Sequence, residues 1–469
     1  MKLGRQWEER LKIWDEAFGR NLYTQLSEIE LSGFTTMEQL TLAQAAGQSF
    51  SPFPKGARWG RKWEYGWFRA FVAIPEEAAG KRVLVHLGAG PEMLIYVNGR
   101  EAGSIDRQHS MVELVSCAVP GEIFSVYAEC YAGHGVRREG AGICARDDVP
   151  VPEPEEAQCV VESSHIGIHN EEMFEAYADY HTLYDLWKAL PESDLRAMKI
   201  GRALQDFTCR ADFEADWPER CESVREAARY LKPLLEKKNG DTMPVYTTFG
   251  QSHLDLAWLW PAEETKRKAA RTYSNQVALM ERYPDYKFLL CGPTILEYLK
   301  SYYPGLYARV KERAKAGQFV PEGAVYVESD TNLAGGESLI RQFVLGKRWF
   351  RSEFGVDALV AWLPDTFGFT GALPQIMKEC GVPYFATQKL VRCDPECEQF
   401  PYNLFWWEGI DGTRILSHIY KKNNAVFCPG ALRERWEKDR NQRQEIDSFL
   451  FPFGYGDGGG GPTELMVEM

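Results

Sequence analysis

Short runs of apolar residues alternate with longer segments of helical periodicity along the second half of the chain. The apolar runs have the length of buried strands and lie at 245–252, 287–294, 319–328, 357–365 and 384–390. Segments with apolar residues at helical spacing fill the gaps, at 262–284, 295–317, 338–355 and 373–381. This alternation predicts a parallel sheet with flanking helices, and hence an α/β domain over 241–469 that is most simply a barrel.

Helical periodicity also dominates two regions nearer the amino terminus. In residues 1–45, Leu11, Trp14 and Phe18 fall on one face of a helix. In residues 161–240, long segments such as "MFEAYADYHTLYDLWKAL" carry apolar stripes at the same spacing. We therefore expect an N-terminal helical segment and, later, a helical linker region that leads into the α/β domain.

Residues 46–160 have a different sequence pattern, with short runs rich in β-branched and aromatic residues such as "WFRAFVAIP" and "IFSVYAECY". Asn98-Gly99 is a hairpin signal, because both residues accept the positive φ angles of a tight turn. These features predict a β-sandwich of the jelly-roll kind. The acidic, proline-rich segment 147–156 is expected to be its exit or a linker.

Charge and cysteine content narrow the functional classes. The chain of 469 residues has 54 basic and 67 acidic residues, a net charge of −13, which argues against nucleic-acid binding. A charged N-terminus without an apolar core, and the lack of an 18-residue apolar run, argue against a signal peptide and a membrane span. The 11 cysteines are scattered, and the close pair Cys393 and Cys397 has no second pair nearby to complete a zinc knuckle. We expect a cytoplasmic protein with reduced thiols, and leave open whether it forms a homo-oligomer.

Polar residues follow several of the predicted strands. They are His253 and Asp255 after the first run, Glu328, Asp330 and Asn332 after the third, Asp365 after the fourth, Gln388 and Lys389 at the end of the fifth, and Asp457 in "GDGGGGPT". In parallel α/β domains the functional groups gather at the carboxyl ends of the strands. This edge of the sheet is therefore the predicted site.

Three of these residues form a candidate metal site. An imidazole and carboxylates are good ligands for a divalent ion such as zinc. His253 and Asp255, two positions apart in extended chain, point the same way, and Asp365 on another strand end supplies a third ligand. The alternative is that a His-x-Asp pair is ordinary loop polarity, which is the commoner case for such a motif taken alone.

Aromatic residues and paired acids beside these positions suit a sugar. Trp258 and Phe367 flank the candidate ligands, and flat rings match the apolar face of a pyranose, although core packing is the usual role of such residues. Asp365 and Asp457 offer the two carboxyl groups that glycoside hydrolysis needs. The loop "GDGGGGPT" lacks the lysine of a phosphate-binding loop, so its backbone is expected to pass close to another kind of ligand.

Five segments in order, "HLDLAWLWP", "VESDTNLAGGESLIRQ", "LPDTFGFTGALPQI", "WWEGIDGT" and "GYGDGGGGPT", resemble the zinc-dependent α-mannosidases of glycoside hydrolase family 38, in their cytosolic and vacuolar branch. The resemblance implies a seven-stranded β/α barrel and a retaining hydrolase that releases α-linked mannose from oligomannose glycans. It makes His253, Asp255 and Asp365 the ligands of Zn²⁺, with Co²⁺ or Mn²⁺ as alternatives.

The same resemblance distributes the catalytic and binding roles. It makes Asp365 the nucleophile as well as a ligand, and Asp457 the general acid and then base. It places Trp258 and Phe367 against the bound sugar and Lys389 in a neighbouring subsite.

The chain departs from the family at its carboxyl end. The fourth zinc ligand of the family is a histidine well beyond the glycine-rich loop, but the sequence stops at Met469 and His418 is the only histidine after His253. The later helical bundle and β domains of the family are also absent. We therefore expect a C-terminally truncated member.

Other functional classes fit some of the same residues. One is a carbohydrate-binding fragment without activity. Another is a deacetylase-like metal-dependent hydrolase, in which a metal-bound water is the nucleophile and Asp457 is dispensable. A third is an interaction role for the β-sandwich, a fold that serves many functions.

Overall fold

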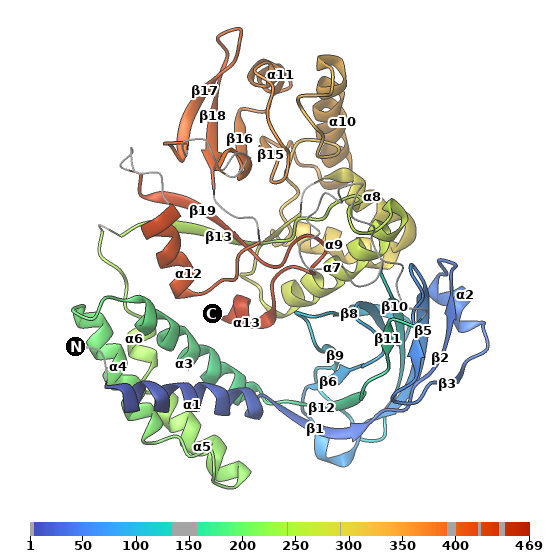
Figure 1. Cartoon of the computed structure of the whole chain (residues 1–469), viewed down its shortest axis with the longest axis vertical. Helices are drawn as coiled ribbons and strands as arrows, with labels where there is room; N and C mark the ends of the chain where they lie inside the picture. The colour runs from blue at the N-terminus through green and yellow to red at the C-terminus, as the bar shows by residue number, and fades with distance from the viewer. Residues whose placement is uncertain are drawn as a thin grey trace, which may run out of the picture. The chain divides into compact units, whose positions relative to one another are not determined.

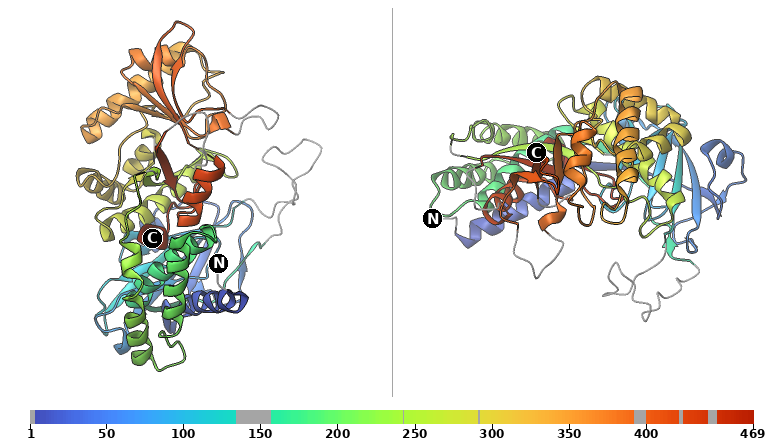
Figure 2. Two further views of the ribbon diagram at one scale, coloured as in Figure 1. Left: turned by 90° about the vertical axis from the view of Figure 1, so that its left-hand side faces the viewer. Right: turned by 90° about the horizontal axis from the view of Figure 1, so that it is seen from above.

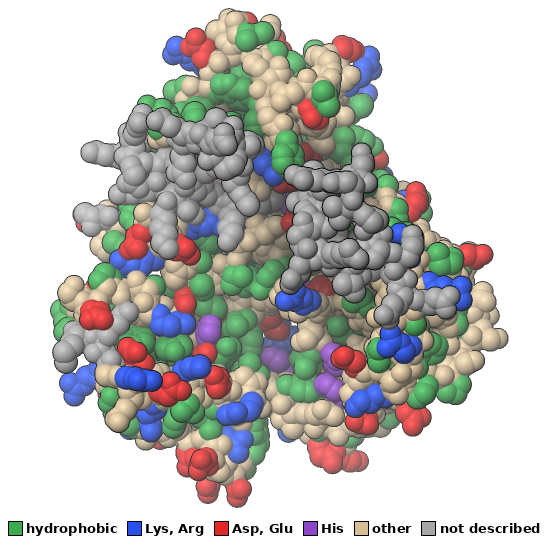
Figure 3. Space-filling view, viewed as in Figure 1, with side chains coloured by type: hydrophobic (Ala, Val, Ile, Leu, Met, Phe, Trp, Pro, Cys, Tyr) green, Lys and Arg blue, Asp and Glu red, His purple; other side chains and the backbone are tan. Residues whose placement is uncertain are grey.

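The computed structural model describes residues 4–133, 157–241, 243–290, 292–391, 400–420, 424–439 and 446–469 (Figures 1 and 2). The expected linker at 147–156 and the Cys393 and Cys397 pair lie outside these residues. The chain divides into two compact units: unit 1 is Met1–Leu22, Asn170–His253 and Leu279–Met469, and unit 2 is Tyr23–His169 and Leu254–Ala278. Acidic and basic side chains are interspersed over the described surface drawn in Figure 3.

Unit 2 consists mainly of antiparallel strands. They are β1 (Tyr23–Glu28), β2 (Ser32–Thr36), β3 (Ser51–Pro52), β4 (Arg58–Trp59), β5 (Tyr65–Ala73), β6 (Val83–His86), β7 (Met93–Val97), β8 (Arg100–Ile105), β9 (Val112–Val115), β10 (Ile123–Tyr131), β11 (Cys159–Val160) and β12 (His165–His169), with the short helix α2 (Leu42–Ala46) and the turn η1 (Glu76–Ala78). The two larger sheets have the orders β1-β12-β6-β9 and β3-β2-β5-β10-β7-β8. Side chains from both sheets, including Phe68, Val85 and Ile166, share one core. The predicted β-rich jelly-roll region is thereby confirmed.

The boundaries of this region differ from those predicted. The first helix, α1 (Arg5–Asn21), stops well before residue 45, and β1 follows at once. The prediction of a helical segment over 1–45 is therefore wrong beyond Asn21. The reason is long-range: β1 pairs with β12, which lies past the predicted end of the sandwich at residue 160. Pairing partners that far away in sequence override local helical preference.

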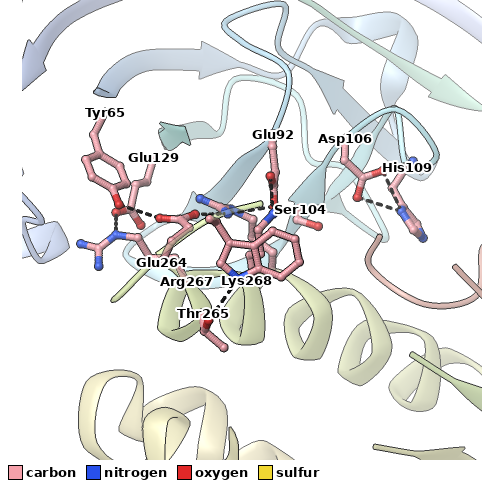
Figure 4. Close-up of polar contacts among 12 residues, drawn as sticks. Tyr65, Glu92, Ser104, Asp106, His109, Glu129, Glu264, Thr265, Arg267 and Lys268 are labelled. Carbon is pink, nitrogen blue, oxygen red and sulfur yellow. Dashed lines mark hydrogen bonds and ion pairs between the residues drawn. The ribbon is translucent and has the colours of Figure 1, made fainter. Parts of the chain in front are cut away.

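A buried ionic cluster joins the sheets of unit 2 to helix α7 (Ala262–Arg282) (Figure 4). Its members are the carboxylates of Glu92, Glu129 and Glu264 and the cations of Arg267, Lys268 and Arg271. Arg271 Nη1 donates to Glu264 at 2.6 Å and to Glu92 at 2.9 Å, and Lys268 Nζ lies 2.7 Å from Glu92. The hydroxyl of Tyr65 on β5 donates to Glu264 at 2.6 Å. The start of α7 is thus held by strands that precede it by well over 100 residues.

The helices of unit 1 that precede the α/β part pack together. They are α1, α3 (Glu171–Ala189), α4 (Leu195–Thr208), α5 (Trp217–Ala228) and α6 (Lys232–Leu235). Figure 1 draws them side by side, and Leu11, Phe18, Tyr180, Leu204 and Phe207 lie in their common core. The region predicted as a helical linker is thus a packed helical group that includes the first helix of the chain.

The rest of unit 1 alternates strands and helices, as predicted. Its strands are β13 (Val245–Gln251), β14 (Phe288–Leu289), β15 (Val360–Trp362), β16 (Tyr384–Thr387), β17 (Leu404–Glu408), β18 (Arg414–Ile419) and β19 (Ser448–Phe453). The helical elements are α8 (Pro293–Tyr302), α9 (Pro304–Lys315), α10 (Gly336–Phe354), α11 (Leu373–Glu379), η2 (Lys389–Val391), α12 (Pro429–Glu434), η3 (Arg435–Asp439) and α13 (Glu464–Glu468). All pairings are parallel except that of β17 with β18.

These strands form two sheets, with the orders β14-β13-β19 and β15-β16-β18-β17. The predicted strand 319–328 contributes only single parallel bridges, from Phe319 to Phe288 and from Gly323 to Ala361. Pro321 has no N–H to donate, and Gly323 and Ala324 have φ angles of 125° and 56°, which interrupt an extended strand. A closed seven-stranded barrel is therefore not confirmed over the described residues.

Candidate active site

His253 and Asp255 follow the carboxyl end of β13, the middle strand of its sheet. The strand is fixed on both sides by parallel pairing with β14 and β19. Gly250 has no room for a side chain, because a Cβ there would lie 1.9 Å from the hydroxyl oxygen of Tyr286. The hydroxyl of Ser252 donates to the carbonyl of Tyr455 at 3.1 Å, which holds the segment after β13 against the segment after β19.

A group that could hold a metal ion lies at this edge. His253, Asp255 and Asp457 each offer one ligand atom, and these atoms lie within 4.8 Å of one another. His253 is buried, and its Nδ1 lies 3.3 Å from Oδ1 of Asp457. An imidazole and two carboxylates are a donor set that fits zinc and other divalent transition metals. The sequence predicted Asp365 as the third ligand, whereas this group contains Asp457.

Asp457 occupies a strained loop after β19. Its φ angle is 54°, in the left-handed region that few residues other than glycine adopt, and Gly458 and Gly460 that follow are also left-handed. The Nδ2 atom of Asn424 donates to Oδ2 of Asp457 at 3.0 Å. Gly456 cannot carry a side chain, since a Cβ would lie 1.9 Å from Oδ1 of Asn424. The glycine-rich loop therefore serves to bring one carboxylate back towards His253.

Asp365 follows β15 and is paired with a cation. Its Oδ1 lies 2.6 Å from Nζ of Lys389, which follows β16. The same Nζ lies 3.8 Å from the ring centroid of Phe367, a cation–π contact. Lys389 thus contacts both Asp365 and Phe367, and all three residues were selected from the sequence.

Glu328 contacts both His253 and the segment that carries Asp365, although the sequence analysis assigned it no role beyond its place after a strand. Its Oε1 accepts hydrogen bonds from the backbone N–H of Asp365 at 2.6 Å and the hydroxyl of Thr366 at 3.1 Å. Its Oε2 lies 3.3 Å from Nε2 of His253. Its position at the end of the predicted strand "VYVE" was the one signal in the sequence that could mark Glu328 as a site residue. The spacing of residues along the chain does not indicate which side chains Glu328 contacts.

The aromatic residues selected from the sequence differ in their exposure to solvent. Phe367 is 66% exposed and Trp258 is 37% exposed, so both present ring surface to solvent. Trp260 is buried, and its Nε1 donates to the hydroxyl of Thr265 at 3.1 Å on α7. Phe369 packs edge-on against Phe385 at 4.9 Å. The two residues predicted to contact a sugar thus have the most exposed rings, whereas Trp260 is buried and Phe369 is half-buried.

Comparison with known proteins identifies two regions. Residues 244–469 match the model of the glycosyl hydrolases family 38 N-terminal domain, and residues 24–148 match the jelly roll domain of α-mannosidase. The chain is 33% identical to alpha-mannosidase 2C1 of Mus musculus over 95% of its own length, and 29% identical to alpha-mannosidase G of Dictyostelium discoideum over 97%. A solved α-mannosidase from Enterococcus faecalis V583 is 24% identical, with a TM-score of 0.42, over 48% of this chain and 26% of that one.

These relatives are longer than the chain, which spans 42% of the length of each of the two named above. Among the residues that the structure describes, none of the helices combines the length and apolarity that a bilayer crossing requires.

Proposed function

Because residues 244–469 match the N-terminal domain of glycosyl hydrolases family 38, we propose that the chain forms the part of a retaining α-mannosidase that carries the nucleophile and the acid. Its substrates would be glycans with terminal α-linked mannose. The observation that carries this proposal is the meeting of His253, Asp255 and Asp457 in one group at the end of β13, in a region that matches the family model.

In the proposed reaction a carboxylate oxygen of Asp365 bonds to C1 of mannose as the bond from C1 to the leaving oxygen breaks, and Asp457 gives that oxygen its proton. Water then attacks C1, Asp457 takes up a proton from it, and the ester to Asp365 breaks. Two inversions at C1 release mannose with its original configuration. The exposed rings of Trp258 and Phe367 would line the sugar site.

A metal ion fits the residues present. We propose that His253, Asp255 and Asp365 hold a divalent ion, with zinc favoured over Co²⁺ or Mn²⁺ by the resemblance to the family. Such an ion supplies Lewis-acid attraction for the hydroxyl groups of the sugar. Lys389, now 2.6 Å from Asp365, would hold the carboxylate in place and, through its contact with Phe367, shape the sugar subsite.

The position of Asp457 favours a second candidate. Asp457 joins His253 and Asp255 in the ligand group, whereas Asp365 pairs with Lys389. The alternative is therefore a deacetylase-like, metal-dependent hydrolase, whose reaction forms no ester between Asp365 and a sugar. In that case Asp457 is a ligand, and no covalent adduct forms on Asp365.

Trapping with a fluorinated mannoside separates the two. The retaining reaction predicts a stable mannosyl adduct on the peptide that contains Asp365, located by mass spectrometry, and none in Asp365→Asn. Asp357→Asn is the matched control, because Asp357 precedes the same strand and pairs with Arg351 on its other side. Zinc bound in molar proportion without any adduct on Asp365 would select the second candidate. The cytoplasmic location and the oligomeric state remain predictions.

A further inference from the structure

The six-stranded sheet of the jelly roll has one face turned away from the core, and α7 covers part of it. Tyr65 on β5 belongs to the covered part, where its hydroxyl donates to Glu264 of α7 (Figure 4). Successive side chains of a strand alternate between the two faces, so Arg69 and Phe71 lie on the same face as Tyr65. Phe71 is 65% exposed, so this part of the face is open to solvent.

Arg69 is a half-buried cation that contacts two aromatic rings. Its Cζ atom lies 4.2 Å from the ring centroid of Phe50 and 5.6 Å from that of Phe71. Among the described residues, no carboxylate pairs with the guanidinium, and its buried Nε has no hydrogen-bond partner. The two terminal nitrogens, by contrast, reach solvent. Polar groups of folded proteins are normally hydrogen-bonded, so this arginine has donors to spare for a ligand.

Tyr127 on β10 adds a third ring. It is the neighbour of Arg69 across the pair of β5 and β10, and its ring centroid lies 6.0 Å from that of Phe50. Its hydroxyl group can both donate and accept a hydrogen bond. Phe50, Arg69, Phe71 and Tyr127 are referred to below as the jelly-roll surface, which combines exposed ring area with the terminal N–H groups of an arginine.

A neutral ligand rich in hydroxyl groups fits this surface better than an anion does. The rings already attract the charge of Arg69, and their faces carry a negative potential that disfavours an anion beside them. The unmet requirement is for oxygen atoms that accept from the terminal nitrogens, and sugar hydroxyl groups supply them. The apolar C–H face of a pyranose packs against a flat ring such as that of Phe71.

We propose that the jelly-roll surface is a second sugar-binding site, which holds a mannose residue of a glycan and shares no residue with the proposed active site. The choice of mannose rests on the proposed function, whereas the choice of a neutral sugar rests on the surface itself. A second site raises the affinity for glycans large enough to engage both sites. It leaves the hydrolysis of a small aryl mannoside unchanged.

Fluorine NMR tests the site directly. The 469-residue chain carries 4-fluorophenylalanine and the change Asp365→Ala, which keeps the glycan from being consumed. The resonance that disappears in Phe71→Leu belongs to Phe71. We expect it to shift in a saturable way when an α-linked mannopentaose is added, and not when inorganic phosphate is added. A shift with phosphate would reveal an anion site, and a shift with protein concentration alone would reveal contact between copies; either would overturn the proposal.

Arg69→Met and Arg107→Met form a matched pair. Both remove one positive charge from the jelly roll, but Arg107 is exposed between β8 and β9 and is not part of the surface. Loss of the hydrogen bonds from Arg69 should weaken mannopentaose binding, followed by the Phe71 resonance, roughly 10-fold. Arg107→Met should leave the affinity unchanged. Equal affinities in the two variants would overturn the proposed role of Arg69.

The outcomes for this site and for the proposed function are separable. A Phe71 resonance that does not respond to mannopentaose, in a protein whose unmodified form hydrolyses an aryl mannoside, would overturn the second site and leave the proposed function standing. A saturable response in a chain whose unmodified form gives no adduct on Asp365 would support the second site and count against the retaining reaction.

Discussion

The ionic cluster on α7 and the candidate site after β13 both gather carboxylates, but they differ in what faces the negative charge. In the cluster three carboxylates meet three cations, and Glu129, Glu264 and Arg271 are at most 2% exposed. In the site the contacts described above join the four carboxylates of Asp255, Glu328, Asp365 and Asp457 to one imidazole and one lysine.

Balanced charges suit a structural role, since buried carboxylates are stable when paired cations replace the water that they have lost. An acid-rich set with partly exposed members suits a role in which a cation or a substrate completes the charge. The exposed fractions agree with this division, because Asp365 and Asp457 are 26% and 43% exposed. The comparison predicts that mutations in the site remove function and spare folding, and that mutations in the cluster do the reverse.

The largest effect is expected at Asp365. Asp365→Ala should reduce hydrolysis of an aryl α-mannoside by roughly 10⁴-fold or more, since a nucleophile cannot be replaced by its neighbours. The thermal unfolding midpoint should stay close to that of the unmodified protein. Full turnover in this variant would contradict the role of Asp365 as the nucleophile. A large drop in its unfolding midpoint would show that the site, like the ionic cluster, contributes to stability.

Asp457→Asn should have the next largest effect, and its pattern matters more than its size. An acid contributes roughly 10²–10⁴-fold, mainly for leaving groups that need a proton. We therefore expect substrates with poor leaving groups to lose far more than activated aryl mannosides, in kcat/KM measured side by side. Equal losses on both substrates, with a loss of bound zinc, would make Asp457 a metal ligand.

Arg271→Met tests the cluster. Glu92 and Glu264 would lose the cation that they share. Burial raises the pKa of Glu264, and the charge of Arg271 acts in the opposite direction by lowering it, so the substitution removes a partner that a buried carboxylate needs. Breaking a buried pair in this way costs about 3–5 kcal/mol of unfolding free energy, measurable by urea denaturation. Arg341→Met is the control, because Arg341 and its partner Glu337 are both 71% exposed; it should leave the midpoint unchanged. Similar midpoints for the two variants would refute the structural role.

The smallest effect concerns a half-buried histidine, His418, which is not one of the proposed ligands. Burial lowers the pKa of His418 from its usual 6.5 to about 4, and its Nε2 accepts the N–H of Leu450 at 3.4 Å. The unfolded chain therefore takes up a proton at higher pH than the folded one, so stability falls as the pH drops from about 6.5 to about 4. The loss amounts to about 3 kcal/mol. His418→Gln should flatten this part of the pH profile, and an unchanged slope would rule out His418 as its source.

Local patterns predicted much of the fold. The Asn98-Gly99 signal is confirmed, with φ angles of 49° and 81° between β7 and β8, because a tight turn depends on few residues. The alternation of β13, α7 and the later elements followed from apolar spacing in the same way. The prediction of a regular strand over 319–328 was wrong. Its apolar pattern continues through Gly323 and Ala324, but the positive φ angles of these two residues interrupt the strand, and the apolar pattern does not indicate those angles.

The candidate site was predictable in its residue types and not in its contacts. His253, Asp255 and Asp457 do meet at one edge, which the rule on strand ends anticipates. The pairing of Asp365 with Lys389 and the bridge through Glu328 depend on side-chain directions at three strand ends. Those directions come from packing between distant segments, which spacing along the chain does not encode.

The charged face of α7 limits how the protein can be divided. The family model begins at residue 244, yet Glu264, Arg267 and Arg271 find their partners on β5, β10 and the segment before β7. A polypeptide cut at that boundary would leave Arg267 without Glu129 and Lys268 without Glu92, and Arg271 would keep only Glu264 within α7, directly after the segment that carries His253 and Asp255. Replacement of the jelly roll in this chain would remove Glu92 and Glu129 in the same way, so the family-matched region is expected to depend on the jelly roll for its folding.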